Sequence, residues 1–147
     1  MMIDVRSPQT AEEWKAYYQL RYEVLREPWN QPPGSEVLPD DQTDIIHVAA
    51  YDTDGITLGV ARLHTNADSR GQVRCVAVSK TAQGKGVGKK LMAHLETLAQ
   101  RMGVTEIILE ARENAVPFYQ SLGYDVTQTS YLLFNEIQHY TMLKRLA

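Results

Sequence analysis

The chain has 147 residues, 44% hydrophobic and 22% charged, which is typical of one soluble globular domain with its own core. Its formal net charge of −3 argues against a general polyanion binder, so no nucleic-acid partner is expected. The single cysteine, Cys75, excludes an internal disulfide and fits a reducing compartment. The start of the chain does not resemble a signal peptide, and no stretch reaches the ~18 apolar residues of a membrane span. We therefore expect a cytoplasmic protein without a membrane partner, forming one domain over residues 1–147.

The first third of the chain predicts a strand, a helix and a long loop. A strand is expected over residues 2–6 and an amphipathic helix over residues 11–26, with Ser7 or Thr10 as its cap. Residues 27–44 contain four prolines and a glycine, a composition that indicates an irregular loop. Loops of that length in a compact domain are usually functional or mobile, so this one is a candidate for the substrate side.

The remaining sequence predicts alternating strands and helices. Turn signals separate two apolar runs that form a hairpin, and strand–helix–strand patterns follow it. We expect strands over residues 45–51, 56–64, 72–78, 105–111, 124–128 and 140–146, and helices over residues 89–102 and 115–123. Residues 130–139 carry no clear pattern. Within them, residues 134–139 read as an irregular insertion and are a second candidate for the substrate side. Hairpins followed by strand–helix–strand units favour an α+β fold with a mixed sheet.

The stretch "QGKGVGKK", residues 83–90, is the clearest candidate for a ligand site. A nucleotide-binding P-loop would need glycine at Gln83 and a hydroxyl residue at Lys90, so that motif fails. A dinucleotide fingerprint needs G-x-G-x-x-G, whereas the glycines here alternate and Lys89 occupies the last position. Two alternatives remain: a different phosphate-binding loop, or a glycine-rich turn that holds no ligand.

Two blocks of sequence resemble the GNAT superfamily of acyltransferases. The segment "VAVSKTAQGKGVG", residues 76–88, matches a strand followed by the [QR]-x-x-G-x-[GA] motif, with Gln83, Gly86 and Gly88 in the motif positions. The segment "AVPFYQSLGY", residues 115–124, is similar to the A-x-x-F-Y-x-x-x-G-[FY] block of the same superfamily. The resemblance covers roughly residues 45–125. The ending "EIQHYTM", residues 136–142, and the segment over residues 20–36 look like an uncharacterised bacterial branch of the superfamily.

This resemblance implies a fold and a cosubstrate. The fold is α+β, with a mixed, mostly antiparallel sheet, splayed central parallel strands and flanking helices. The cosubstrate is acetyl-CoA, without a metal: glycine-loop amides at a helix start would hold its pyrophosphate, and an unpaired strand edge would pair with its pantetheine arm. The implied cofactor-binding residues are Val76, Ala77, Val78, Gln83, Gly84, Lys85, Gly86, Val87, Gly88, Lys89, Asn114 and Phe118. The family often has asparagine where this chain has Arg112, so Asn114 either takes its place or only caps the following helix.

The resemblance also assigns Tyr119 as the acid that protonates the departing thiolate, although a packed aromatic side chain is the alternative. An amine with a pKa near about 10.4 is almost wholly protonated at neutral pH, so a base or a water relay is expected. The sequence does not choose that base. The candidates are Glu36, Asp40, Asp41, Asp44, Glu110, His47 and His139.

The expected reaction is transfer of an acetyl group to a primary amine by direct attack on the thioester. Such a transfer needs no acyl-enzyme, so Cys75 is read as a strand residue. A longer acyl-CoA donor is one alternative, and an acyl-CoA-binding sensor or partner-binding domain without turnover is another. A small-molecule acceptor is expected rather than a protein, and the oligomeric state stays open, a homodimer included.

Overall fold

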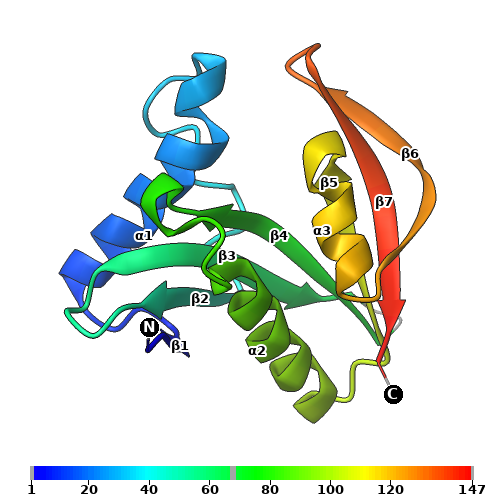
Figure 1. Cartoon of the computed structure of the whole chain (residues 1–147), viewed down its shortest axis with the longest axis horizontal. Coiled ribbons are helices and arrows are strands. Elements are labelled where there is room, and N and C mark those ends of the chain that lie inside the picture. Colours follow the sequence, from blue (N-terminus) through cyan, green and yellow to red (C-terminus); the bar gives the residue numbers. More distant parts are fainter. Residues whose placement is uncertain (1, 67–68, 147) are drawn as a thin grey trace. The chain divides into compact units, whose positions relative to one another are not determined.

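The computed structural model describes residues 2–66 and 69–146, which form two compact units. Unit 1 comprises Met1–His64 and Cys75–Leu95, and unit 2 comprises Thr65–Arg74 and Glu96–Ala147. The strands shown in Figure 1 are β1 (Asp4–Arg6), β2 (Ile46–Tyr51), β3 (Thr57–Thr65), β4 (Arg70–Val78), β5 (Glu106–Arg112), β6 (Asp125–Leu133) and β7 (Ile137–Arg145). The helices are α1 (Ala11–Leu25), α2 (Val87–Arg101) and α3 (Val116–Ser121), with single 3₁₀ turns η1 (Glu27–Trp29), η2 (Lys80–Ala82) and η3 (Glu113–Ala115).

Hydrogen bonds link the strands in the order β1-β2-β3-β4-β5-β7-β6. The pairs β1–β2, β2–β3, β5–β7 and β6–β7 are antiparallel, whereas β4 and β5 are parallel. The predicted α+β fold with a mixed, mostly antiparallel sheet is therefore confirmed. The parallel register runs from Arg70 opposite Glu106 to Val73 opposite Leu109 and stops there. The central strands are thus hydrogen-bonded only over the first part of β4, as the splayed pair requires.

Unit 1 is built around β3, which has a helix on each face. The first helix, α1, begins with a capping box in which the Thr10 hydroxyl accepts from the Glu13 amide at 3.1 Å. On one face of β3, Val60 packs with Tyr17 of α1 in a buried apolar cluster. On the other face, a Cβ at Gly59 would lie 2.8 Å from Val87 of α2. Glycine at that position therefore lets the start of α2 approach the sheet closely.

Unit 2 contains β5, α3 and a hairpin of β6 and β7. The expectation of an irregular insertion over residues 134–139 was wrong, because residues 134–136 make a three-residue turn after β6 and the residues that follow begin β7. Phe134 and Asn135 both have positive φ, 54° and 57°, and the Glu136 amide donates to the Leu133 carbonyl at 3.0 Å. That geometry is a type I′ turn, which suits the twist of a hairpin.

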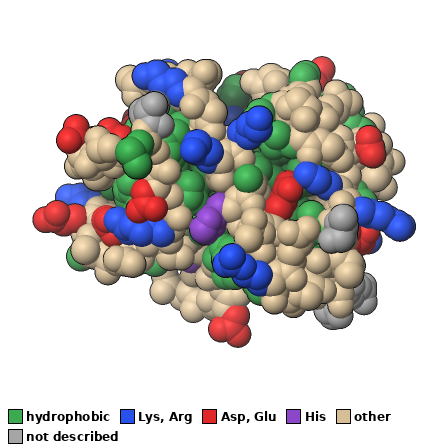
Figure 2. All heavy atoms as spheres, turned by 60° about the horizontal axis from the view of Figure 1, so that its bottom comes forward, with side chains coloured by type: hydrophobic (Ala, Val, Ile, Leu, Met, Phe, Trp, Pro, Cys, Tyr) green, Lys and Arg blue, Asp and Glu red, His purple; other side chains and the backbone are tan. Residues whose placement is uncertain are grey.

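Two surface properties bear on the partners of the chain. Among residues 2–66 and 69–146, no helix is long and apolar enough to cross a membrane. On the face drawn in Figure 2, Lys and Arg side chains are scattered among Asp and Glu side chains rather than gathered into one patch.

Candidate active site

The glycine loop, residues 83–88, leads from β4 into the start of α2 within unit 1, and its backbone is accessible. Gly84 and Gly86 have φ of 78° and 80°, a region that L-residues rarely adopt. A Cβ placed at either glycine would meet no atom within 4 Å, so the space above both residues is open. Gly88 lies inside α2 and needs no such freedom. The loop therefore bends at two of its three glycines.

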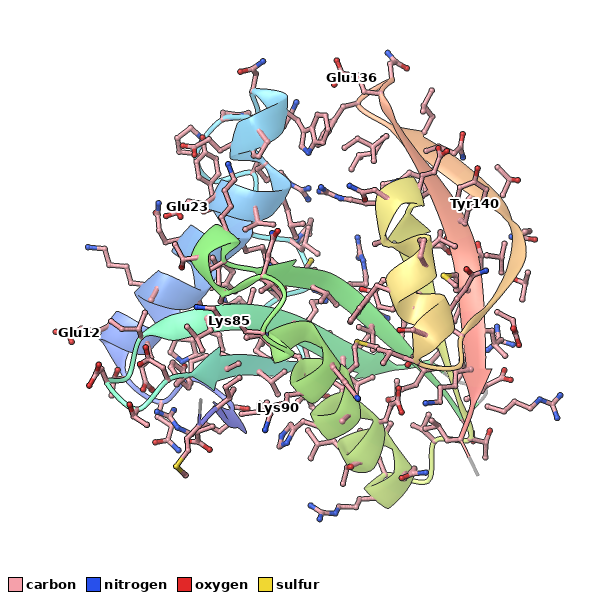
Figure 3. The ribbon with its side chains drawn as sticks, viewed as in Figure 1. Glu12, Glu23, Lys85, Lys90, Glu136 and Tyr140 are labelled. Carbon is pink, nitrogen blue, oxygen red and sulfur yellow. The ribbon has the colours of Figure 1, made fainter. Side chains whose placement is uncertain are left out.

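The amides that follow these glycines are available to a ligand. The Lys90 amide donates to the Gly86 carbonyl at 3.1 Å. Within the described part of the chain, no turn or capping hydrogen bond uses the amides of residues 84–89. The exposed side chains of Lys85, Lys89 and Lys90 surround them, and Figure 3 shows Lys85 on the loop and Lys90 on the first turn of α2. Free amides at a positive helix end, with lysines nearby, suit a phosphate group.

The last residues of β4 carry the second distinctive backbone feature of unit 1. Cys75 has a φ of 58° inside the strand, two residues after the register with β5 ends. A non-glycine residue in this region is strained, and such strain concentrates at functional sites. Ala77 is buried in the core, whereas Val76 and Val78 are half-buried. What this segment offers to a ligand is therefore mainly its backbone.

Tyr119 lies on α3 in unit 2 and is only 7% exposed. Its ring makes edge-to-face contacts with Phe118 at 5.0 Å and Tyr124 at 5.9 Å between centroids. Burial raises the pKa of Tyr119, and the charge of Arg112 only partly opposes that shift. The hydroxyl is therefore protonated at neutral pH, as a proton donor must be. The same packing is what a structural aromatic would show, so the geometry allows both roles.

Asn114 does not cap α3. It lies exposed in η3, and the N-cap residue of α3 is Ala115, which makes no side-chain capping bond. The capping interpretation of Asn114 was wrong, while its proposed contact with the cofactor stays a prediction. Gln83 is also exposed, with its side-chain amide 3.5 Å from the Val78 carbonyl oxygen.

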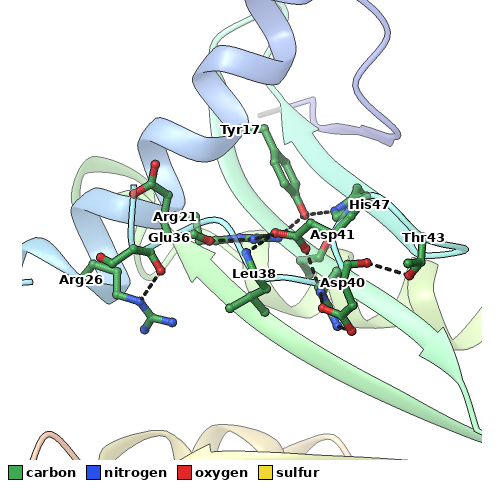
Figure 4. A network of polar contacts seen from close by, with 12 residues as sticks. Tyr17, Arg21, Arg26, Glu36, Leu38, Asp40, Asp41, Thr43 and His47 are labelled. Carbon is green, nitrogen blue, oxygen red and sulfur yellow. Dashed lines mark hydrogen bonds and ion pairs between the residues drawn. The ribbon is translucent and has the colours of Figure 1, made fainter. Parts of the chain in front are cut away.

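The aspartates that end the proline loop belong to a buried charge network (Figure 4). Asp41 is bound by Arg21 and Arg62, each at 2.7 Å, and accepts from the Leu38 amide at 2.7 Å. Burial raises the pKa of Asp41, but the Leu38 amide and the two guanidinium groups outweigh it and lower the pKa. Asp40 pairs with Arg62 at 2.8 Å. Asp41 is therefore an anchor of the loop and an unsuitable proton acceptor.

His47 is part of the same network and uses both ring nitrogens. Its Nε2 lies 3.0 Å from the Asp41 carbonyl oxygen, which can only accept, so Nε2 carries the hydrogen. Its Nδ1 then accepts from the Tyr17 hydroxyl at 2.7 Å. Burial lowers the pKa of His47. The ring is a neutral structural bridge between α1, the loop and β2.

Two other candidates for the base come together in unit 2. The register of β5 with β7 sets Glu110 opposite Thr141 and Arg112 opposite His139. The Thr141 hydroxyl donates to Glu110 at 2.8 Å. Glu110 and His139 were separate candidates from the sequence, whereas Thr141 was missed. Because β5 and β7 pair although they are not consecutive in the chain, no local sequence signal indicates this grouping.

Comparison with known proteins identifies the family of the chain. The model of the acetyltransferase (GNAT) domain matches residues 7–146. The chain is 31% identical over 133 residues to the uncharacterized N-acetyltransferase YjcF of Bacillus subtilis, which covers 90% of this chain and 93% of the relative. An acyl-CoA N-acyltransferase from Pseudomonas aeruginosa superposes with a TM-score of 0.81 at 27% identity, covering 97% of this chain and 98% of the other. Escherichia coli ElaA gives 0.81 at 25% identity, covering 97% and 99%.

The fold and these relatives define an N-acetyltransferase. The chain belongs to the GNAT acetyltransferase family.

Proposed function

We propose that this protein transfers an acetyl group from acetyl-CoA to a primary amine by direct attack on the thioester. The observation that carries the proposal is the pairing of two backbone features within unit 1: the open amides of residues 84–89 and the strained strand end at Cys75. The open amides suit a phosphate, and the unpaired strand edge that follows Cys75 up to Val78 suits an extended pantetheine arm. The Pseudomonas aeruginosa relative, an acyl-CoA N-acyltransferase, supports an acyl-CoA donor. One domain over residues 1–147 carries this activity.

In this proposal the cofactor half of the site lies along residues 76–90. The amides of residues 84–88 would bind the pyrophosphate, with Lys85 and Lys89 adding charge. Backbone groups of Val76 and Val78 would pair with the pantetheine amides, as in strand addition. A β4 amide would also polarise the thioester carbonyl, since oxygen charge grows during attack. Asn114 and Phe118 are the remaining residues that we propose as cofactor contacts.

The chemistry requires one bond to form and one to break. The amine nitrogen attacks the thioester carbon, the new C–N bond forms, and the C–S bond breaks. The amine gives up a proton and the thiolate takes one, which we assign to the Tyr119 hydroxyl. No acyl-enzyme is needed, so the half-buried thiol of Cys75 takes no part. The alternative of an acyl-CoA sensor without turnover predicts binding alone.

Thiol release from acetyl-CoA across an amine panel tests the proposal. The panel holds polyamines, amino sugars, amino acids and a lysine peptide, and each mixture is checked by mass spectrometry for an acetylated product. We expect thiol release that depends on one small-amine class. Tight acetyl-CoA binding without release on any amine would support the sensor and contradict the transferase.

A further inference from the structure

The two faces of β5 separate the ionisable groups of unit 2. Along a strand, alternate side chains point to opposite faces. Ile107, Leu109 and Ala111 are buried on one face. Lys144, which is opposite Ile107, pairs with Glu96 at 2.8 Å and lies 5.7 Å from the Tyr124 ring.

That first face is the one to which Tyr119 belongs. The Tyr124 hydroxyl donates to Glu96 at 2.9 Å, and the Tyr124 ring contacts Tyr119. The other face carries Glu110 and Arg112 of β5, with Thr141 and His139 opposite them on β7. The proposed thiol acid and the Glu110–His139 group therefore lie on opposite faces of the same strands.

The hydrogen bond of His139 determines which nitrogen can act as a base. Its Nδ1 lies 3.0 Å from the Ile137 carbonyl oxygen. A carbonyl oxygen only accepts, so Nδ1 carries the hydrogen and the neutral ring keeps its lone pair on Nε2. The Tyr131 ring stacks on the imidazole at 4.4 Å with an interplanar angle of 15°. The ring is therefore fixed in both tautomer and orientation.

The surroundings of His139 keep the ring neutral until it receives a proton. Burial lowers the pKa of His139, and the charge of Arg112 lowers it further. The hydrogen bond to Ile137 and the charge of Glu110 oppose this shift. The groups that face the ring are thus one cation and one anion from β5 and a neutral phenol from β6. At neutral pH the ring is an unprotonated base, and Glu110 stabilises the imidazolium once it forms.

We propose that Nε2 of His139 is the general base that takes the proton from the attacking amine, with Glu110, held by Thr141, stabilising the imidazolium. This assignment rests on the proposed acetyl transfer. As the C–N bond forms and the C–S bond breaks, the amine proton goes to Nε2, and the thiolate receives a proton from Tyr119. Each exchange occurs on its own face of β5, so the two groups do not neutralise each other directly. After the product leaves, the imidazolium returns its proton to solvent and the Tyr119 phenolate takes one back from solvent, which restores both groups.

His47 gives an internal contrast. It is also buried and neutral, yet it carries its hydrogen on Nε2 and accepts at Nδ1 from Tyr17. The two buried histidines are therefore predicted to be opposite tautomers. Long-range ¹H–¹⁵N correlation spectra of the whole chain report the tautomer directly. Nδ1–H at His139 with Nε2–H at His47 supports the assignment, and Nε2–H at His139 overturns it without any acceptor being needed.

The kinetic arm uses His139→Asn, because the asparagine amide can still donate to Ile137 but cannot accept a proton. With acetyl-CoA and an amine from the panel, we expect kcat to fall about 10²-fold at unchanged acetyl-CoA affinity. The acid limb of the wild-type kcat profile, which lies below pH about 6.5, should disappear. His94→Asn on α2 is the matched control and should keep wild-type kcat.

The outcomes separate the two claims. If the wild type turns over and the folded His139→Asn variant keeps the full kcat, the base assignment is overturned. The proposed acetyl transfer would then stand. Acetyl-CoA binding without turnover by the wild type on every amine would overturn the proposed function, and the base assignment with it.

Discussion

Asp41 is the anion that two fully buried arginines share. Arg21 is 1% exposed and Arg62 is 0% exposed, and removing the carboxylate leaves their charge under-compensated. We expect Asp41→Asn to lower the free energy of unfolding by about 3–5 kcal/mol, measured by urea denaturation. The exposed neighbour Asp44 offers the matched control, since Asp44→Asn should stay within about 0.5 kcal/mol. A loss below about 1 kcal/mol for Asp41→Asn would show that the network contributes little.

The same residue gives a pH dependence with a definite sign. The folded-state pKa of Asp41 lies below its ordinary value, so its stabilisation is complete above the unfolded pKa of about 3.9. The stabilisation is lost as the pH falls from there through the folded pKa. The difference in unfolding free energy between wild type and Asp41→Asn should therefore be constant at neutral pH and shrink in acid. A difference that grows as the pH falls would contradict this account.

Tyr119 is where the packing role and the acid role can be separated. Tyr119→Phe keeps the ring contacts with Phe118 and Tyr124 and removes only the proton donor. We expect kcat to fall roughly 10²-fold with acetyl-CoA affinity nearly unchanged. Acyl donors with more acidic leaving thiols should lose less, because they need less help from an acid. An unchanged kcat in the folded variant would make water the proton source and leave Tyr119 as a packed aromatic.

At the scale of one element, the glycine loop can be tested against a turn with the same backbone. Gly86→Asp puts a side chain and a negative charge at a position with φ 80°, beside the amides proposed to bind pyrophosphate. Calorimetry should show acetyl-CoA binding weakened by at least ~2 kcal/mol. Gly55 in the β2–β3 turn has φ 81° and equally open space, so Gly55→Asp carries the same backbone strain away from the loop. If both variants weakened acetyl-CoA binding equally, the proposal that residues 84–88 bind the pyrophosphate would be contradicted.

Elements that are determined by residues close together in sequence could be predicted, whereas those determined by distant contacts could not. The start of α1 was predictable because Thr10 and Glu13 form the capping box by themselves. The turn at Phe134 and Asn135 was missed, since a phenylalanine at φ 54° gives no turn signal in sequence. The positive φ of Cys75 also has no signal in the sequence, because the surrounding structure and not the cysteine side chain imposes it.

The candidate site shows the same division. Gln83, Gly84 and Gly86 could be recognised because the loop motif is contiguous. The role of Asp41 could not, because Arg21 and Arg62 reach it only in the folded chain. The grouping of Glu110 with His139 likewise needs the β5–β7 register. This register could not be predicted, because the two strands are not consecutive in the chain.

At the scale of the whole molecule, the residues proposed for cofactor binding and those proposed for proton transfer fall mostly in different units. Residues 76–90, which would bind the cofactor, lie in unit 1. Asn114 and Phe118, which are also proposed as cofactor contacts, belong to unit 2. Tyr119 and His139, which would move protons, lie in unit 2. Variants of the glycine loop should therefore change acetyl-CoA affinity, and variants of Tyr119 and His139 should change kcat. The family match over residues 7–146 spans both groups.

The most direct test of the central claim is hydrogen–deuterium exchange of the whole chain with and without coenzyme A. We expect strong protection of residues 76–90. Residues 27–44 and 134–139, proposed for the acceptor side, should be protected less. Strong protection of the proline loop by coenzyme A alone would move that loop out of the acceptor role. Unchanged exchange over residues 76–90 at saturating coenzyme A would contradict the proposal that acetyl-CoA binds along these residues.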